Sequence, residues 1–122
     1  MFEFNKALDA NYLEEMYDSD LSMISMLFST FLDDTLPLWD GIGPAIQEGN
    51  LAEAASLTHQ VKPAFAMVAL PALHVKVKEF EKYIKEESAK EALLSQYAEL
   101  SKEITVAKEI IKSEYERIEK DM

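Results

Sequence analysis

Residues 51–84 read LAEAASLTHQVKPAFAMVALPALHVKVKEFEKYI, and this stretch decides the fold class. Its apolar residues recur at steps of three and four, which is the spacing of one face of an α-helix. The pattern pauses before Pro71, a residue type suited to the first turn of a helix. We therefore predict one helix from Leu51 onwards and another from Pro71. The expected buried positions are Ala54, Leu57, Thr58, Val61, Phe65 and Val68 in the first helix, and Leu73, Val77, Phe80 and Ile84 in the second.

Helical periodicity also precedes this stretch. A short helix is expected over residues 9–17, with Asp9 as its N-cap. The triplet Asp18-Ser19-Asp20 is typical of a cap for a long second helix, which should end at Gly49-Asn50. Pro37 falls inside that helix and is expected to kink its axis without breaking it. The core face of this helix should comprise Leu21, Ile24, Leu27, Phe28, Phe31, Leu38, Ile42 and Ile46.

A last helix is expected after Glu86-Glu87-Ser88, running to about Ile118. Its apolar positions keep close to a seven-residue repeat: Leu93, Tyr97, Leu100, Ile104, Ala107, Ile111 and Ile118. Such a repeat could form a coiled-coil dimer. A long helix within a bundle needs the same stripe, however, and we favour this second interpretation and a monomer.

These helices are joined by short loops, which favour antiparallel packing of neighbours. The length of 122 residues suits one domain, and we assign residues 1–122 to a single unit. The sequence therefore predicts an all-α fold, an antiparallel up-and-down four-helix bundle with a short additional N-terminal helix.

The composition excludes several classes of function. The chain has no cysteine, so it has no disulfides, no thiol catalysis and no cysteine-based zinc site. Its net charge of -11 argues against nucleic acid as a partner, because phosphate backbones attract basic surfaces. No apolar run approaches the roughly 18 residues of a membrane span, and the N-terminus does not look like a secretory signal. We therefore expect a cytoplasmic protein with no membrane contact.

His59 is expected to point away from the core, because it lies about 160° around the helix axis from both Leu57 and Val61. Lys62 lies one turn later on the face of His59, and it is the only cation between residues 6 and 76. The other neighbours on that face have short side chains, which leave the imidazole open to a docking protein: Ala55, Ser56, Pro63 and Ala66.

Such a pair suits phosphoryl transfer. An exposed imidazole is partly neutral at neutral pH, and it is then nucleophilic without an activating base. Transfer also requires neutralisation of the charge on the phosphoryl oxygens, which the ammonium group of Lys62 could supply. The simpler interpretation is a surface histidine without a role, since a lysine three residues after a histidine is common by chance. The surrounding sequence favours the functional pair.

Residues 54–70, AASLTHQVKPAFAMVAL, resemble the signature of the histidine-containing phosphotransfer (HPt) family. In that signature a histidine, an apolar residue two positions later and a lysine three positions later precede a small residue and a short turn. The similarity extends upstream through residues 27–38, a Phe- and Leu-rich segment with a proline, and through Gly49-Asn50-Leu51. It covers roughly residues 8–86.

The resemblance implies that His59 is the phosphoacceptor and that Lys62 faces the phosphate. Members of the family have no ATP site and are not kinases or ATPases. They relay phosphoryl groups between the receiver domains of hybrid sensor histidine kinases and response regulators, in transient complexes. Mg²⁺ would come from the receiver domain, and no cofactor or metal would be bound by this chain.

Two positions depart from the family pattern. Pro63 stands where the family usually has glycine. It lacks an N–H and crowds the carbonyl of His59 four residues back, so it is expected to bend the helix and to alter the approach of a receiver. Ala69 also stands where glycine is frequent, which is a milder change.

Other candidate residues have simpler interpretations. The helix predicted from Pro71 carries a stripe of three lysines, Lys78, Lys82 and Lys85. Such a stripe is typical of solvated surface. The alternative is a docking contact through Lys78 and Lys82. His74 lies beside the core position Leu73, and no motif gives it a role.

Two other functions stay open. The first is a helical adaptor that is not phosphorylated and that binds and regulates a receiver or a kinase. The second is a metal-dependent enzyme that uses the many carboxylates. Against the enzyme, neither histidine has a glutamate three residues before it, as the Glu-x-x-His motif of di-iron bundles requires.

Overall fold

All regular structure in the described residues is helical. A computed structural model describes residues 2–18, 20–86 and 89–121, and no strand occurs in these ranges. The helices are α1 (Ala10–Tyr17), α2 (Leu21–Thr30), α3 (Leu36–Asp40), α4 (Ile42–Gln47), α5 (Leu51–Met67), α6 (Pro71–Lys85) and α7 (Lys90–Asp121), with a π-helical turn (Phe31–Thr35) between α2 and α3. The predicted all-α class is confirmed. Ser19, Glu87 and Ser88, which the sequence placed at helix boundaries, lie outside the described residues.

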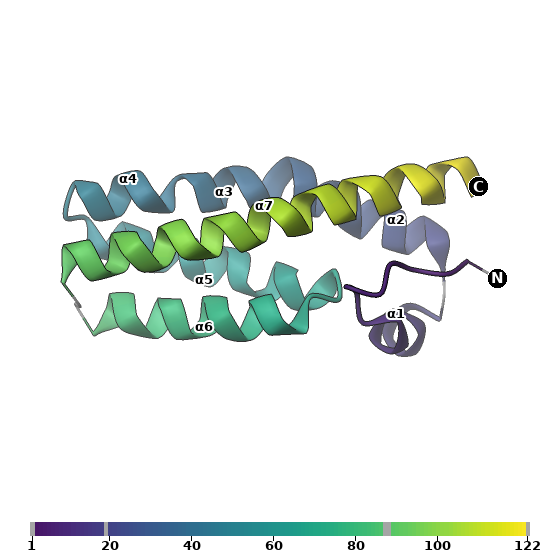
Figure 1. Ribbon diagram of the computed structural model, residues 1–122, viewed down its shortest axis with the longest axis horizontal. Coiled ribbons are helices and arrows are strands. Elements are labelled where there is room, and N and C mark those ends of the chain that lie inside the picture. Colours follow the sequence, from purple (N-terminus) through teal and green to yellow (C-terminus); the bar gives the residue numbers. More distant parts are fainter. Residues whose placement is uncertain (1, 19, 87–88, 122) are drawn as a thin grey trace.

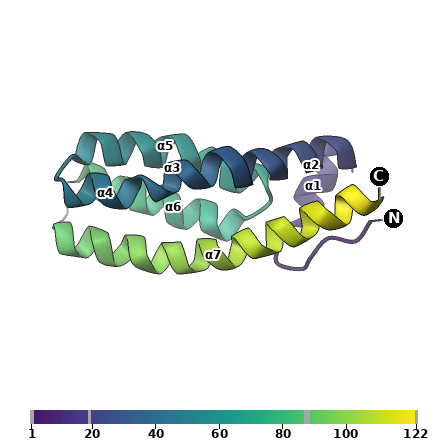
Figure 2. The same cartoon turned by 90° about the horizontal axis from the view of Figure 1, so that it is seen from above.

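The helices pack lengthwise around a common core. In two perpendicular views α2, α3 and α4 follow one another along one line, with α5, α6 and α7 beside them and α1 at one end (Figures 1 and 2). The α5 helix packs on α6, α3 and α4, whereas α7 packs on α2, α4 and α6. Within the described ranges, no helix has the length and apolar character needed to cross a membrane.

The α5 helix begins at Leu51, as the sequence predicts, and ends at Met67. Asn50 is its N-cap, with a side-chain oxygen that accepts a hydrogen bond from the backbone N–H of Glu53 at 3.1 Å. Buried Ala54, Val61 and Phe65 line its inner face. After Val68 the chain turns through Ala69, whose φ of 63° lies in the left-handed region that glycine adopts most readily. The α6 helix then starts at Pro71, which needs no N–H in a first turn.

The long second helix is where the prediction was wrong. Instead of one helix kinked at Pro37, the chain forms a π turn at Phe31–Thr35, in which the N–H of Leu36 donates to the carbonyl of Phe31, five residues back. Pro37 has no N–H to donate, and the wide turn before it lets it lie in the first turn of α3. A separate helix, α4, follows after Gly41.

The extra residue of the π turn rotates every later side chain by about 100° relative to a continuous α-helix. Leu38, predicted to be buried, is 36% exposed as a consequence. Leu36 and Trp39 take its place in the core, at 7% and 2% exposure. All other predicted core positions are buried or half-buried.

Trp39, on α3, contacts three other helices. Its ring stacks on Tyr97 of α7 at 5.0 Å between centroids, and it also lies 5.9 Å from Phe80 of α6 and 6.5 Å from Phe65 of α5. Its indole N–H donates to the hydroxyl of Ser101 at 3.0 Å, and the Tyr97 hydroxyl donates to the Trp39 carbonyl at 2.8 Å. These contacts combine apolar burial with satisfied polar groups, so they hold α3, α5, α6 and α7 in one arrangement.

Alanine substitutions at Leu36 and Leu38 test the phase of this helix. Truncation of buried Leu36 leaves a cavity, so Leu36→Ala should lower the free energy of unfolding by about 2–4 kcal/mol. Leu38→Ala, at a position 36% exposed, should cost less than about 1 kcal/mol. Urea unfolding followed by circular dichroism measures both values. A continuous α-helix would place Leu38 in the core, so the reverse order would contradict the π turn.

Candidate functional site

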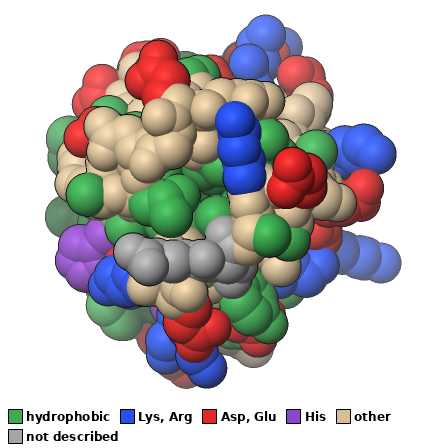
Figure 3. Space-filling view, turned by 90° about the vertical axis from the view of Figure 1, so that its left-hand side faces the viewer, with side chains coloured by type: hydrophobic (Ala, Val, Ile, Leu, Met, Phe, Trp, Pro, Cys, Tyr) green, Lys and Arg blue, Asp and Glu red, His purple; other side chains and the backbone are tan. Residues whose placement is uncertain are grey.

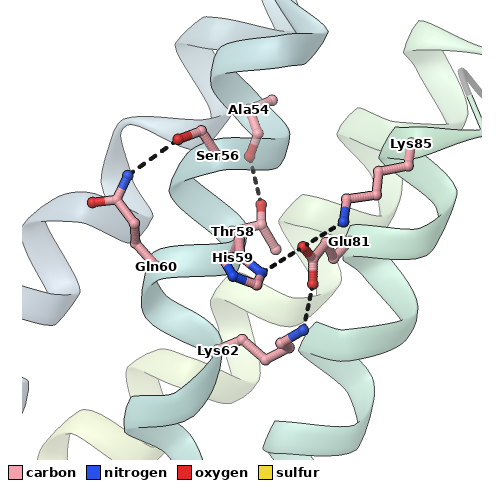
Figure 4. Close-up of polar contacts among 8 residues, drawn as sticks. All are labelled: Ala54, Ser56, Thr58, His59, Gln60, Lys62, Glu81 and Lys85. Carbon is pink, nitrogen blue, oxygen red and sulfur yellow. Dashed lines mark hydrogen bonds and ion pairs between the residues drawn. The ribbon is translucent and has the colours of Figure 1, made fainter.

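His59 stands on the outer face of α5. Its side chain is 67% exposed, while its neighbour Thr58 and the later residue Val61 are buried. The prediction that His59 points away from the core is therefore confirmed. Thr58 is accommodated inside because its hydroxyl donates to the carbonyl of Ala54 at 2.7 Å, one turn back (Figure 4).

Glu81 of α6 is the centre of the polar contacts beside His59 (Figure 4). Its side chain is only 4% exposed. One carboxylate oxygen, Oε2, lies 3.0 Å from Nδ1 of His59 and 3.1 Å from Nζ of Lys85. The other, Oε1, accepts a hydrogen bond from Nζ of Lys62 at 2.7 Å. A single buried carboxylate thus holds one imidazole and two ammonium groups from two adjacent helices.

The ionisation state of Glu81 fixes the tautomer of His59. Burial alone raises the pKa of Glu81, but the hydrogen bonds from Lys62 and Lys85 outweigh it and bring the pKa below its ordinary value of 4.5. Glu81 is therefore ionised at neutral pH, and an ionised carboxylate can only accept hydrogen bonds. Nδ1 of His59 must carry the proton that it shares with Oε2, which leaves the lone pair of the neutral ring on Nε2.

Lys62 reaches the site, but its ammonium group is directed at Glu81. The side chain is 22% exposed, and its short contact to Oε1 accounts for that direction. The prediction that Lys62 lies on the face of His59 agrees with this placement. To meet a group carried on Nε2, its ammonium would have to leave Glu81 or be shared with it.

The predicted neighbours of His59 on α5 surround it with small side chains. Ser56 and Pro63 are exposed, whereas Ala55 and Ala66 are half-buried. The Ser56 hydroxyl accepts a hydrogen bond from the side-chain amide of Gln60 at 3.2 Å. The α5 helix continues through Pro63 without interruption.

The lysine stripe of α6 divides into two parts. Lys85 belongs to the site through Glu81. Lys78 and Lys82 are exposed, and Nζ of Lys82 lies 4.0 Å from a carboxylate oxygen of Glu86. His74 is half-buried, two turns before Glu81. In the ranges that the structure describes, no group of three or more histidine, aspartate or glutamate side chains is placed to hold a metal ion.

Glu81 is the residue that sequence reasoning missed. It lies between the core positions Val77 and Ile84, four residues after one and three before the other, and therefore on the apolar stripe of α6. A carboxylate within such a stripe is a signal of a buried, paired charge. Its partners could not be identified from the sequence, because two of them come from another helix.

Glu81→Gln tests the charge of this network. The pKa of Glu81 is lowered in the folded chain, so its stabilising contribution is present above 4.5 and is lost as the pH falls through the depressed value. We expect Glu81→Gln to lower the free energy of unfolding by about 1–3 kcal/mol at pH 7, with a deficit that shrinks towards pH 3.

Urea unfolding across this pH range measures the deficit. Glu99→Gln is the matched control, because Glu99 is 72% exposed and pairs only at the surface with Lys102. It should change stability by less than about 0.5 kcal/mol. A deficit for Glu81→Gln that stays constant from pH 7 to pH 3 would contradict the ionised state of Glu81.

Comparison with known proteins adds no relative to this geometry. No protein-family model, no curated protein and no solved structure matches the chain. The resemblance to HPt proteins therefore stays a prediction, and the site is interpreted from its own residues.

Proposed function

We propose that this chain is a histidine phosphotransfer protein, in which His59 accepts a phosphoryl group from the aspartyl phosphate of one receiver domain and passes it to another. The observation that supports this proposal best is the exposed imidazole of His59, held at Nδ1 by a buried carboxylate. This contact fixes the ring and leaves Nε2 as its nucleophilic nitrogen.

The transfer step uses that nitrogen directly. The lone pair of Nε2 attacks the phosphorus atom, and the P–O bond of the aspartyl phosphate breaks as the carboxylate leaves with the bonding electrons. The ring then carries the phosphoryl group on Nε2 and keeps its proton on Nδ1, beside the negative charge of Glu81. The reverse reaction, with a second receiver aspartate as the nucleophile, unloads the group. Mg²⁺ bound by the receiver would neutralise the phosphoryl oxygens during both steps.

The proposal includes the finer architecture. The segment from α2 to α4 would form one rod of an antiparallel up-and-down four-helix bundle, α5, α6 and α7 the other three, and α1 the additional N-terminal helix. The lengthwise packing of these segments supports it (Figure 2). Residues 1–122 would then be one HPt domain, a cytoplasmic monomer without kinase activity of its own.

Receiver domains and a hybrid sensor kinase would be the transient partners, and they would dock around His59. The small side chains of Ser56, Pro63 and Ala66 leave room for a close approach. Seen from the end where α4 meets α5, a histidine lies at the rim of the molecule next to a basic side chain (Figure 3). Lys78 and Lys82 would contribute at the edge of this surface.

His59→Gln tests the proposal. Incubation of the wild-type chain with phosphorylated receiver domains from the same cell and Mg²⁺ should label it with a phosphoryl group that is labile in acid and stable in alkali. His59→Gln should abolish labelling because it removes the nitrogen that attacks the phosphorus, whereas the control His74→Gln should keep it. Mass spectrometry and autoradiography measure the transfer.

The adaptor function gives a different result in the same experiment. An adaptor would bind a receiver or kinase without being labelled, and His59→Gln would leave its regulation of that partner intact. Absence of labelling by every receiver tested would reject the phosphotransfer proposal.

A further inference from the structure

Two cations contact the same carboxylate as His59. Lys62 contacts Oε1 of Glu81 at 2.7 Å, and Lys85 contacts Oε2 at 3.1 Å. Oε2 also lies 3.0 Å from Nδ1 of His59, so the ammonium of Lys85 and the imidazole share one oxygen atom. A phosphoryl group on His59 would therefore appear beside cations that already have an anionic partner.

Counting charges shows the consequence. A phosphoryl group brings about two negative charges at neutral pH. Glu81 adds a third negative charge, and Lys62, Lys85 and the ring protonated at Nδ1 together supply three positive ones, so the loaded site has no surplus of positive charge. Because Glu81 is only 4% exposed, water cannot screen it fully if the lysines leave it. The phosphoryl group and Glu81 thus compete for the same two cations.

The contact at Nδ1 acts in the same direction. When water or an aspartate attacks the phosphorus, the N–P bond breaks and its electrons return to Nε2. The ring leaves as neutral imidazole only if Nδ1 keeps its proton, and as a poor imidazolate leaving group otherwise. An anionic carboxylate 3.0 Å from Nδ1 favours the protonated, cationic phosphoimidazole.

From these contacts we infer that Glu81 is a positioning residue that shortens the lifetime of the phosphoryl group on His59, by withholding Lys62 and Lys85 from it and by keeping the proton on Nδ1. The inference rests on the proposed function of His59. According to this inference, His59 holds the phosphoryl group only briefly and transfers it readily to a receiver.

Decay of the phosphorylated protein tests the inference without a partner protein. Potassium phosphoramidate is the phosphodonor: its N–P bond breaks, ammonia leaves, and the new N–P bond forms on Nε2 of His59. After the reagent is removed, ³¹P NMR at neutral pH follows the loss of phosphohistidine. We expect Glu81→Gln, which keeps a hydrogen-bond acceptor but not the charge, to lengthen the lifetime about threefold to tenfold.

Two further variants make the test specific. Lys85→Gln removes a cation and keeps Glu81, so it should shorten the lifetime. This change at a side chain 60% exposed also serves if Glu81→Gln fails to fold. Glu79→Gln is the matched control on the same helix: Glu79 is exposed and lines the groove towards α7, so the lifetime should not change. In 8 M urea, which removes the contacts, Glu81→Gln and the wild type should decay at equal rates.

The outcomes separate the two proposals. A labelled wild type whose lifetime equals or exceeds that of Glu81→Gln overturns the inference and leaves His59 as a phosphoacceptor. Lengthening by Lys85→Gln overturns it as well. A wild-type chain that neither phosphoramidate nor any receiver labels on His59 overturns the phosphotransfer function, and the inference with it.

Discussion

The ion-paired carboxylate of Glu81 is the interaction on which the rest of the site depends. A buried charge is costly unless donors surround it, and here the donors come from two helices, Lys62 and His59 on α5 and Lys85 on α6. Apolar side chains tolerate small slides of one helix along another, but the contacts of His59 and Lys62 with Glu81 cross from α5 to α6 and therefore depend on the register of these two helices. The packing of α5 on α6 and the orientation of the imidazole therefore have the same cause.

The aromatic cluster around Trp39 packs against the inner faces of α5 and α6. The burial of Trp39 follows from the π turn, because an unbroken helix would direct Leu38 into the core and Trp39 towards solvent. A backbone irregularity in the segment between α2 and α3 thus determines which side chain supports Phe65 and Phe80, which lie on the helices of the site. The exposed face of α5 can carry small side chains around His59 because its inner face is anchored by these rings.

The sequence predicted the helices and the outward direction of His59 because both depend on local periodicity. That periodicity can be read directly from a single amino-acid sequence. It did not predict the exposure of Leu38, since a π turn changes the phase without leaving a residue pattern that distinguishes it from a proline kink. Glu81 was visible as a carboxylate on an apolar stripe, but two of its three partners, His59 and Lys62, lie 22 and 19 residues earlier on another helix. Such pairings depend on the register between helices, which periodicity does not determine.

The distribution of charge suits a carrier that releases what it binds. Residues 51–86, which contain α5 and α6, carry five lysines and four glutamates, a net charge of +1. Since the whole chain has a net charge of -11, the remainder carries -12. If His59 is phosphorylated, Lys62 and Lys85 attract the phosphoryl group at short range, while Glu81 and the acidic body oppose it. A strongly basic pocket would trap a dianion, and an unrelieved acidic surface would exclude it. The balance of charge in this chain lies between these two cases, which is compatible with the proposed loading and release.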